Sequence, residues 1–144
     1  MQISSSSFAD GGIIPPKCAM KAVPGGANIS PQIKISGIPP AAQSLAIAFV
    51  DRHPMARRWV HWLAVNLIPG EIEIPEGASP SRMPAGCLEL INTFGFRGYG
   101  GPQPPTHHYP FTPPFAVNGM KSRFSVHHTG SVPRIPRRLP LRNT

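Results

Sequence analysis

The sequence predicts a single, mainly β domain, and three observations carry that prediction. The first is a turn-forming composition, with 20 prolines and 14 glycines among 144 residues. The second is that apolar residues occur in short runs between these turns, and the third is the absence of a long helical period. A chain of this length can bury the core of one domain but is too short for two substantial ones.

The N-terminal third contains turns and one well-defined strand. Phe8–Gly12 is predicted to form a turn and Ile13–Pro16 a short extended piece, because paired glycines allow positive φ and paired prolines oppose a helix. A second turn leads into Gln32–Gly37, where Ile33 and Ile35 alternate with polar residues. This period of two predicts a strand with both isoleucines on its inner face.

Two apolar runs, Leu45–Val50 and Leu63–Ile68, flank a polar stretch and predict a strand, a loop and a strand. If Asp51 and Trp59 form an antiparallel pair, Asp51 and His61 become diagonal neighbours, about 7–8 Å apart at Cα. As long as no bulge intervenes, this register puts one set of residues on a common face: Leu45, Ile47, Phe49 and Asp51 with Trp59, His61, Leu63 and Val65.

A carboxylate beside an imidazole on an apolar face is costly to bury unless the two groups are paired or solvated. Two interpretations therefore stay open for Asp51 and His61, a satisfied polar pair or the wall of a pocket. With His107 they would also suit a metal site of two histidines and one carboxylate, or acid–base hydrolysis. The sequence has no nucleophile elbow around a serine, which disfavours esterase chemistry.

After the second strand the sequence favours loops. Glu71–Arg82 alternates Pro, Gly, Ser and Glu in the manner of a surface loop, and its three glutamates are expected to be solvated. The only plausible helical turn is Ala85–Asn92, which Gly86 weakens.

Phe94–Tyr109 is rich first in glycine and then in proline. Such glycines let the backbone pass close to a ligand and direct N–H groups at it, which suits an anion. The segment lacks the Lys-Ser/Thr pair of a P-loop and no strand-to-helix unit follows, so the sequence disfavours nucleotide binding.

The net charge of +8 belongs mainly to the C-terminus. Residues 119–144 contain no acid and carry +6 of it, which leaves +2 for the rest of the chain. This basic tail would bind nucleic acid or an acidic surface weakly and with strong salt dependence. It lacks a platform for stacking bases, because Phe124 is its only aromatic residue. Its cations are Lys121, Arg123, Arg134, Arg137, Arg138 and Arg142.

Cys18 and Cys87 stand far apart without a C-x-x-C pair, so we expect two small thiols, buried or half-buried, rather than a zinc site or a disulfide. Met1–Asp10 lacks the basic start and apolar core of a signal peptide, and no run approaches the length of a bilayer span. The cytoplasm is the expected compartment, and no cofactor is expected.

Short motifs between Phe8 and about Thr112 follow one another in a distinctive order and spacing: Asn28-Ile29-Ser30-Pro31, Ser44-Leu45-Ala46, Trp59-Val60-His61-Trp62, Asn66-Leu67-Ile68-Pro69, Asn92-Thr93-Phe94-Gly95, Gly98 to Pro105, and His107-His108-Tyr109. Together they resemble the motifs of the phosphatidylethanolamine-binding protein family, in particular its bacterial and archaeal Raf-kinase-inhibitor-like branch.

That resemblance implies a β-fold with a large central antiparallel sheet, a smaller sheet and few short helices. It also implies a non-catalytic module with a small surface pocket for anionic groups such as a phospholipid head phosphate, which acts on a kinase or protease partner. Histidines suit such a pocket because an imidazole can donate to phosphate oxygens and changes its charge near neutral pH. Carried over by position, the pocket residues would be Asp51, Pro54, Trp59, His61, Gly100, Pro102, His107 and Tyr109.

The sequence departs from the family pattern around this pocket. Asp51-Arg52-His53-Pro54 stands where relatives have Asp-Pro-Asp-Ala-Pro, so the second acid is absent. The loop before His107 is short, His108 replaces an arginine, and Pro110 removes a donor from the strand expected there.

The largest departure is at the C-terminus. Residues 1–118 are predicted to form a domain like that of the phosphatidylethanolamine-binding proteins, without the usual C-terminal helix, and residues 119–144 a proline-containing tail without regular structure. Two origins of the tail stay open, a genuine basic extension or an altered reading frame in a non-functional family member. A missing helix would expose apolar surface and favour a homodimer.

Overall fold

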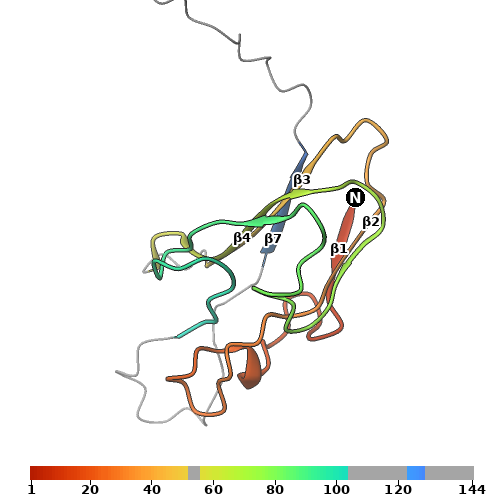
Figure 1. Ribbon diagram of the computed structural model, residues 1–144. Coiled ribbons are helices and arrows are strands. Elements are labelled where there is room, and N and C mark those ends of the chain that lie inside the picture. Colours follow the sequence, from red (N-terminus) through yellow and green to blue (C-terminus); the bar gives the residue numbers. More distant parts are fainter. Residues whose placement is uncertain (52–55, 104–122, 129–144) are drawn as a thin grey trace, which may run out of the picture.

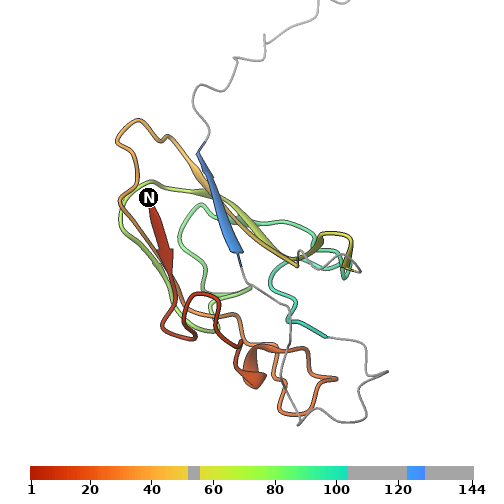
Figure 2. The ribbon, with the colours of Figure 1, turned by 180° about the vertical axis from the view of Figure 1, so that it is seen from behind.

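A computed structural model describes residues 1–51, 56–103 and 123–128 (Figure 1). Within these ranges the chain forms two antiparallel sheets and the short 3-10 helix η1. The larger sheet has the strand order β6-β4-β3-β7 and the smaller sheet the order β1-β2-β5. Figures 1 and 2 show the smaller sheet packed beside the larger one. The fold class predicted from the sequence is confirmed.

The elements have the following bounds: β1 Gln2–Ser4, η1 Pro16–Cys18, β2 Ile33–Ser36, β3 Leu45–Asp51, β4 Trp59–Leu67, β5 Ile72–Ile74, β6 Leu88–Glu89 and β7 Arg123–His128. The extended backbone predicted before η1 is found at Pro15, and Pro16 then begins the 3-10 turn. Proline is suited to this first position, because a backbone N–H there would have no partner within the helix.

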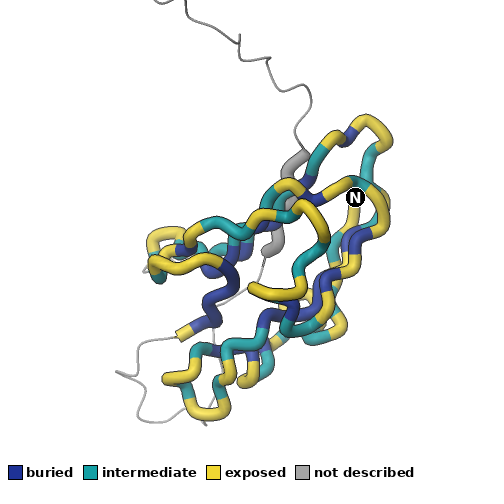
Figure 3. Tube along the Cα trace, viewed as in Figure 1, coloured by how far each residue is buried: buried dark blue, intermediate teal, exposed yellow. Residues whose placement is uncertain are grey.

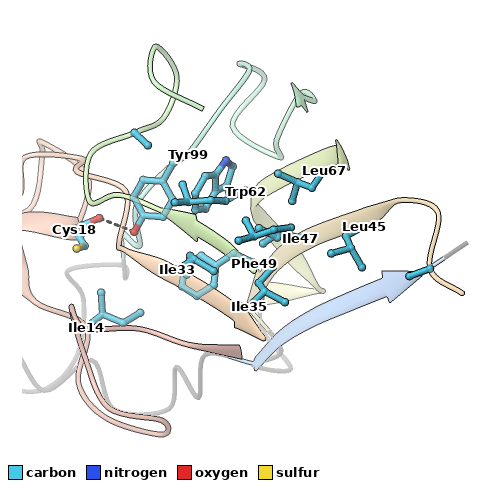
Figure 4. Packing of buried hydrophobic residues seen from close by; sticks show 14 residues of the cluster. Ile14, Cys18, Ile33, Ile35, Leu45, Ile47, Phe49, Trp62, Leu67 and Tyr99 are labelled. Carbon is cyan, nitrogen blue, oxygen red and sulfur yellow. Dashed lines mark hydrogen bonds between the residues drawn. The ribbon is translucent and has the colours of Figure 1, made fainter. Parts of the chain in front are cut away.

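The core lies between the two sheets (Figure 4). Ile33 and Ile35 of β2 are fully buried, as their alternation predicts, and lie near Phe49 of β3. Trp62 of β4 and Tyr99 pack edge to face, with ring centroids 5.7 Å apart. Burial of each such side chain contributes about 1.5–3 kcal/mol, so this cluster holds the two sheets together.

The pairing of β3 with β4 begins as predicted and is then interrupted by a bulge. Asp51 lies opposite Trp59, which confirms the expected pair, but Phe49 lies opposite Trp62. His61 is therefore the extra residue on β4. Such a bulge bends the strand and can redirect a side chain, and His61 is buried.

Leu63 and Val65 were predicted to share a face with His61, and the bulge makes this prediction wrong. The shift of one residue exchanges the two faces of the strand, so Trp62 and Ala64 are buried in the core while Leu63 and Val65 are only half-buried. A second register shift, near Leu45, brings Leu67 back into the core.

The helical turn predicted at Ala85–Asn92 is wrong. Leu88–Glu89 forms β6 and pairs with β4, and the Leu90 N–H donates to the Leu63 carbonyl at 2.8 Å. The outer edge of β4 has backbone groups that need partners, and this segment supplies them. Gly86 has a φ of +78°, which a continuing right-handed helix does not allow.

The loop predicted at Glu71–Arg82 contains a strand. Ile72 and Ile74 are buried and pair with β2, while Glu71 and Glu73 point to solvent as expected. The period of two in this short stretch was a strand signal that its flanking prolines and glycines obscured. Strand β1, at the other edge of the same sheet, had no such signal.

Strand β7 lies within the basic tail. The prediction that residues 119–144 lack regular structure is wrong for Arg123–His128, which pairs antiparallel with β3 from Val50↔Arg123 to Leu45↔His128. Polar and apolar residues alternate in Arg123-Phe124-Ser125-Val126, as a strand requires. The rest of the tail lies outside the described residues, so the expected absence of the C-terminal helix stays a prediction.

Both cysteines are free thiols, Cys18 buried and Cys87 half-buried, as predicted. In the part of the chain that the structure describes, no helix has the length and apolarity to cross a bilayer.

Candidate anion-binding site

His61 is buried where β4 bulges, and its ring is fixed by the backbone of Gly100. Nδ1 lies 2.7 Å from the Gly100 carbonyl oxygen, and the Gly100 N–H donates to the His61 carbonyl at 2.8 Å. A carbonyl oxygen can only accept, so Nδ1 carries a proton. The neutral ring therefore has Nε2 as its acceptor.

The charge state of His61 is set by opposing effects. Burial lowers the pKa of His61 below its ordinary value of 6.5, and the backbone of Gly100 and Gly101 and the charge of Asp51 partly oppose this shift. The ring is therefore mainly neutral at neutral pH. The charge of Asp51 acts on the His61 ring. The two residues predicted from the sequence to be neighbours therefore interact electrostatically in the fold.

Aromatic rings enclose the imidazole. The rings of Phe49 and Phe94 have centroids 5.6 and 5.7 Å from that of His61. Trp59 meets Phe94 edge to face at 5.1 Å. The Trp59 Nε1 atom is buried and has no hydrogen-bond partner in the described structure. A buried indole N–H without an acceptor is unfavourable. The surface formed by Trp59, His61 and Phe94, here called the wall, therefore contains a donor that is free to bind a ligand.

Two arginines lead into the wall. Arg57 and Arg58 have φ values of +47° and +61°, in the left-handed region that residues other than glycine adopt uncommonly. This turn reverses the chain into β4 and leaves both arginines exposed. They add positive charge beside Trp59.

The loop Gly98–Pro102 is buried, although exposed segments precede it (Figure 3). Asn92 Nδ2 donates to the Gly98 carbonyl at 2.9 Å, and Asn28 Nδ2 donates to the Tyr99 carbonyl at 3.2 Å. Asn28 Oδ1 accepts from the Gly101 N–H at 2.7 Å. These bonds fix the backbone that orients His61.

Gly101 fits only as glycine. A Cβ atom here would lie 2.1 Å from the Cys18 carbonyl oxygen and 2.8 Å from the Met20 nitrogen, and neither backbone atom can rotate away. On the other side of the loop the Tyr99 hydroxyl donates to the same Cys18 carbonyl at 2.8 Å. Gly101 is therefore required for close backbone packing, whether or not a ligand is bound.

The structure brings together four of the predicted site residues, Asp51, Trp59, His61 and Gly100. Pro102 is buried behind this wall, where its carbonyl accepts from the Met20 N–H at 3.2 Å. Pro54, His107 and Tyr109 lie outside the described residues.

The list of pocket residues predicted from the sequence did not include Asn28, Asn92 or Phe94. All three occur in the motifs that carried the family resemblance, and this was the available signal. Among residues 1–51, 56–103 and 123–128 there is no group of three His, Cys, Asp or Glu residues that could hold a metal ion.

Comparison with known proteins identifies the family. The phosphatidylethanolamine-binding protein family matches residues 4–114. The chain belongs to this family. A UPF0098 protein of Methanothermobacter thermautotrophicus is 33% identical over 114 residues, which cover 77% of this chain and 73% of that protein. LppC of Mycobacterium tuberculosis is 36% identical over 116 residues, or 78% of this chain.

The fold is also that of solved family members. The crystal structure of Escherichia coli YbcL, described as a new member of the mammalian PEBP family, superposes with a TM-score of 0.66 at 26% identity, covering 75% of this chain and 69% of YbcL. The chain spans only 53% of the length of LppC. Strand β7 lies beyond the residues that match the family.

Proposed function

We propose that this chain is a non-catalytic module that binds a small anion at His61, in particular the phosphate of a phospholipid headgroup. The orientation of the His61 ring carries the proposal. With Nδ1–H committed to Gly100, the ring has one remaining nitrogen for a ligand, at a wall that also contains the spare N–H of Trp59.

An anion bound at Nε2 would favour the protonated imidazole. Nε2–H then donates to the anion, and a charge-assisted hydrogen bond of this kind is about twice as strong as a neutral one. Asp51 supports the imidazolium charge. Binding therefore takes up a proton, and affinity should rise as pH falls.

Family membership supports a binding role, and the family's own description refers to phosphatidylethanolamine. We include a kinase or protease as a protein partner in the proposal, through the Raf-kinase-inhibitor-like motifs. A cytoplasmic location and a homodimer stay predictions from the sequence. The alternative, a metal-dependent or acid–base hydrolase, requires His107 beside Asp51 and His61. A stoichiometric metal ion in protein purified without a chelator would favour it.

Isothermal titration of the full chain with inorganic phosphate and with phosphoethanolamine tests the proposal. We expect H61Q to weaken phosphate binding at least about tenfold, because a hydrogen bond to a charged group is lost. W59F, which removes the indole N–H and keeps an aromatic ring, should weaken it several-fold.

H127Q is the matched control, because it changes a histidine of β7 that lies opposite Ala46, far along β3 from Asp51. It should bind phosphate as the unchanged chain does. Unaltered binding by both H61Q and W59F would remove the ligand from this wall. Tighter binding of phosphoethanolamine than of phosphate would favour a headgroup over the free anion.

A further inference from the structure

A groove lies at the end of β4 opposite to His61, between the two sheets. Its volume is about 260 Å³, and Leu67 and Ile72 are its buried floor. Ile68, which is 70% exposed, and the carboxylates of Glu71 and Glu73 form the rim. Pro84 and Ala85 close the third side. The groove therefore combines apolar surface with negative charge.

The two carboxylates differ in how far they are already compensated. Lys34 of β2 lies opposite Glu73 in the strand register, and Glu73 accepts from Gln32 Nε2 at 3.2 Å. Glu71 makes no hydrogen bond or ion pair with the rest of the described structure, and it is exposed. The groove fits a ligand that brings apolar and cationic side chains together.

The chain itself contains such a segment in the sequence that follows β7, and β7 ends near the groove. Strand β7 ends at His128, opposite Leu45 of β3, and Leu45 in turn lies opposite Leu67 on the groove floor. Two strand spacings, about 10 Å, therefore separate the end of β7 from the groove. Residues 129–144, the C-terminal arm, continue from that point.

The composition of the C-terminal arm complements the groove. It has no acid, and the segment Arg134–Leu141 contains three arginines together with one isoleucine and two leucines. The five residues before this segment can span about 16 Å when extended, which exceeds the separation from the groove. The reach of the five linking residues, the position of the end of β7 and the positive charge of the arm are therefore all compatible with docking in the groove.

We propose that Arg134–Leu141 docks in this groove, with its isoleucine and leucines on Leu67 and Ile72 and its arginines against Glu71 and Glu73. The proposal is independent of the anion site, and it accounts for a basic segment that lies beyond the family match.

Limited trypsin digestion of the full chain tests this docking, because trypsin cleaves after arginines that are accessible. We expect slow cleavage in the C-terminal arm of the unchanged protein at low salt, and cleavage about tenfold faster in E71Q/E73Q. High salt should accelerate cleavage of the unchanged protein, because exposed charge pairs are screened. D10N, which neutralises an exposed acid away from the groove, should leave the rate unchanged.

A second measurement uses hydrogen exchange in the full chain. Amides at Ile68–Glu73 should exchange more slowly in the unchanged protein than in R137Q/R138Q, with circular dichroism confirming that both proteins fold. Equal cleavage rates in the unchanged protein and E71Q/E73Q would overturn the proposal. Protection that increases with protein concentration would also overturn it, since the arm would then occupy a second copy of the chain.

Discussion

The two ends of β4 have opposite chemistry. At the Trp59 end lie a buried indole N–H that has no partner in the described structure and an imidazole bonded to the backbone of Gly100. At the Leu67 end, the strand borders an apolar groove with two carboxylates on its rim. The pairing of β3 with β4 is shifted near each end. Under the two proposals, β4 would contact an anion at one end and a cationic segment at the other.

The two ends also differ in how firmly they are held. The loop beside His61 is held by side chains of three other segments: Asn28 and Asn92 donate to its carbonyls, and the Ser79 hydroxyl accepts from the Tyr99 N–H. At the groove, Asn66 Nδ2 donates to the Gly86 carbonyl at 2.9 Å at an exposed position. We expect the stability of the His61 end to respond strongly to packing changes and that of the groove end weakly.

The largest difference in stability between the two ends of β4 should come from a pair of glycine substitutions, one at each end. Gly101→Ala forces a Cβ against the Cys18 carbonyl oxygen, and we expect a loss of about 3 kcal/mol in the free energy of unfolding, together with weaker phosphate binding. Gly86→Ala meets no atom within 4 Å but has a φ of +78°, so it should cost about 1 kcal/mol.

Urea unfolding of both variants measures these costs, and phosphate titration measures the effect on binding. Equal losses for the two glycines would mean that the loop beside His61 moves aside easily, and the contrast between the ends would disappear.

Two asparagines provide a smaller contrast. Asn92→Ala removes a buried donor from the Gly98 carbonyl, and we expect a loss of about 2 kcal/mol, because a buried carbonyl is left without its partner. Asn66→Ala, at an exposed position with a φ of +64°, should cost about 1 kcal/mol.

Thermal or urea denaturation gives the stabilities. Phosphate affinity should fall only in Asn92→Ala, since that side chain supports the loop that orients His61. A similar fall in Asn66→Ala would show that the two ends are coupled along β4.

The smallest expected effect is a pH dependence of stability. Because burial lowers the pKa of His61 in the folded protein, the unfolded chain binds the proton more readily. Stability attributable to His61 is therefore complete above its unfolded pKa of 6.5 and decreases as pH falls below that value. Urea midpoints measured across this range should decrease less in H61Q.

Added phosphate should reduce the same pH dependence, because it favours the charged ring. A slope that is identical in H61Q and the unchanged protein would assign the acid sensitivity to other groups.

Several features followed from local sequence patterns. The alternation around Ile33 and Ile35, the apolar run at Leu45–Val50 and the pairing of Asp51 with Trp59 were all predictable, because each depends on residues close together in the chain. The motif order also identified the family. Asp51, His61 and Gly100 were placed in one site by that resemblance.

The tertiary structure alone decided which side chains the bulge sends inward, and it put Trp62 in the core rather than Leu63. It also decided that Gly101 packs on Cys18 and that β7 pairs with β3. These features depend on contacts between residues distant in sequence, where the need to satisfy backbone groups and fill space outweighs local preference. A period of two shows that a strand forms, but only its partners determine its register and its place in the sheet.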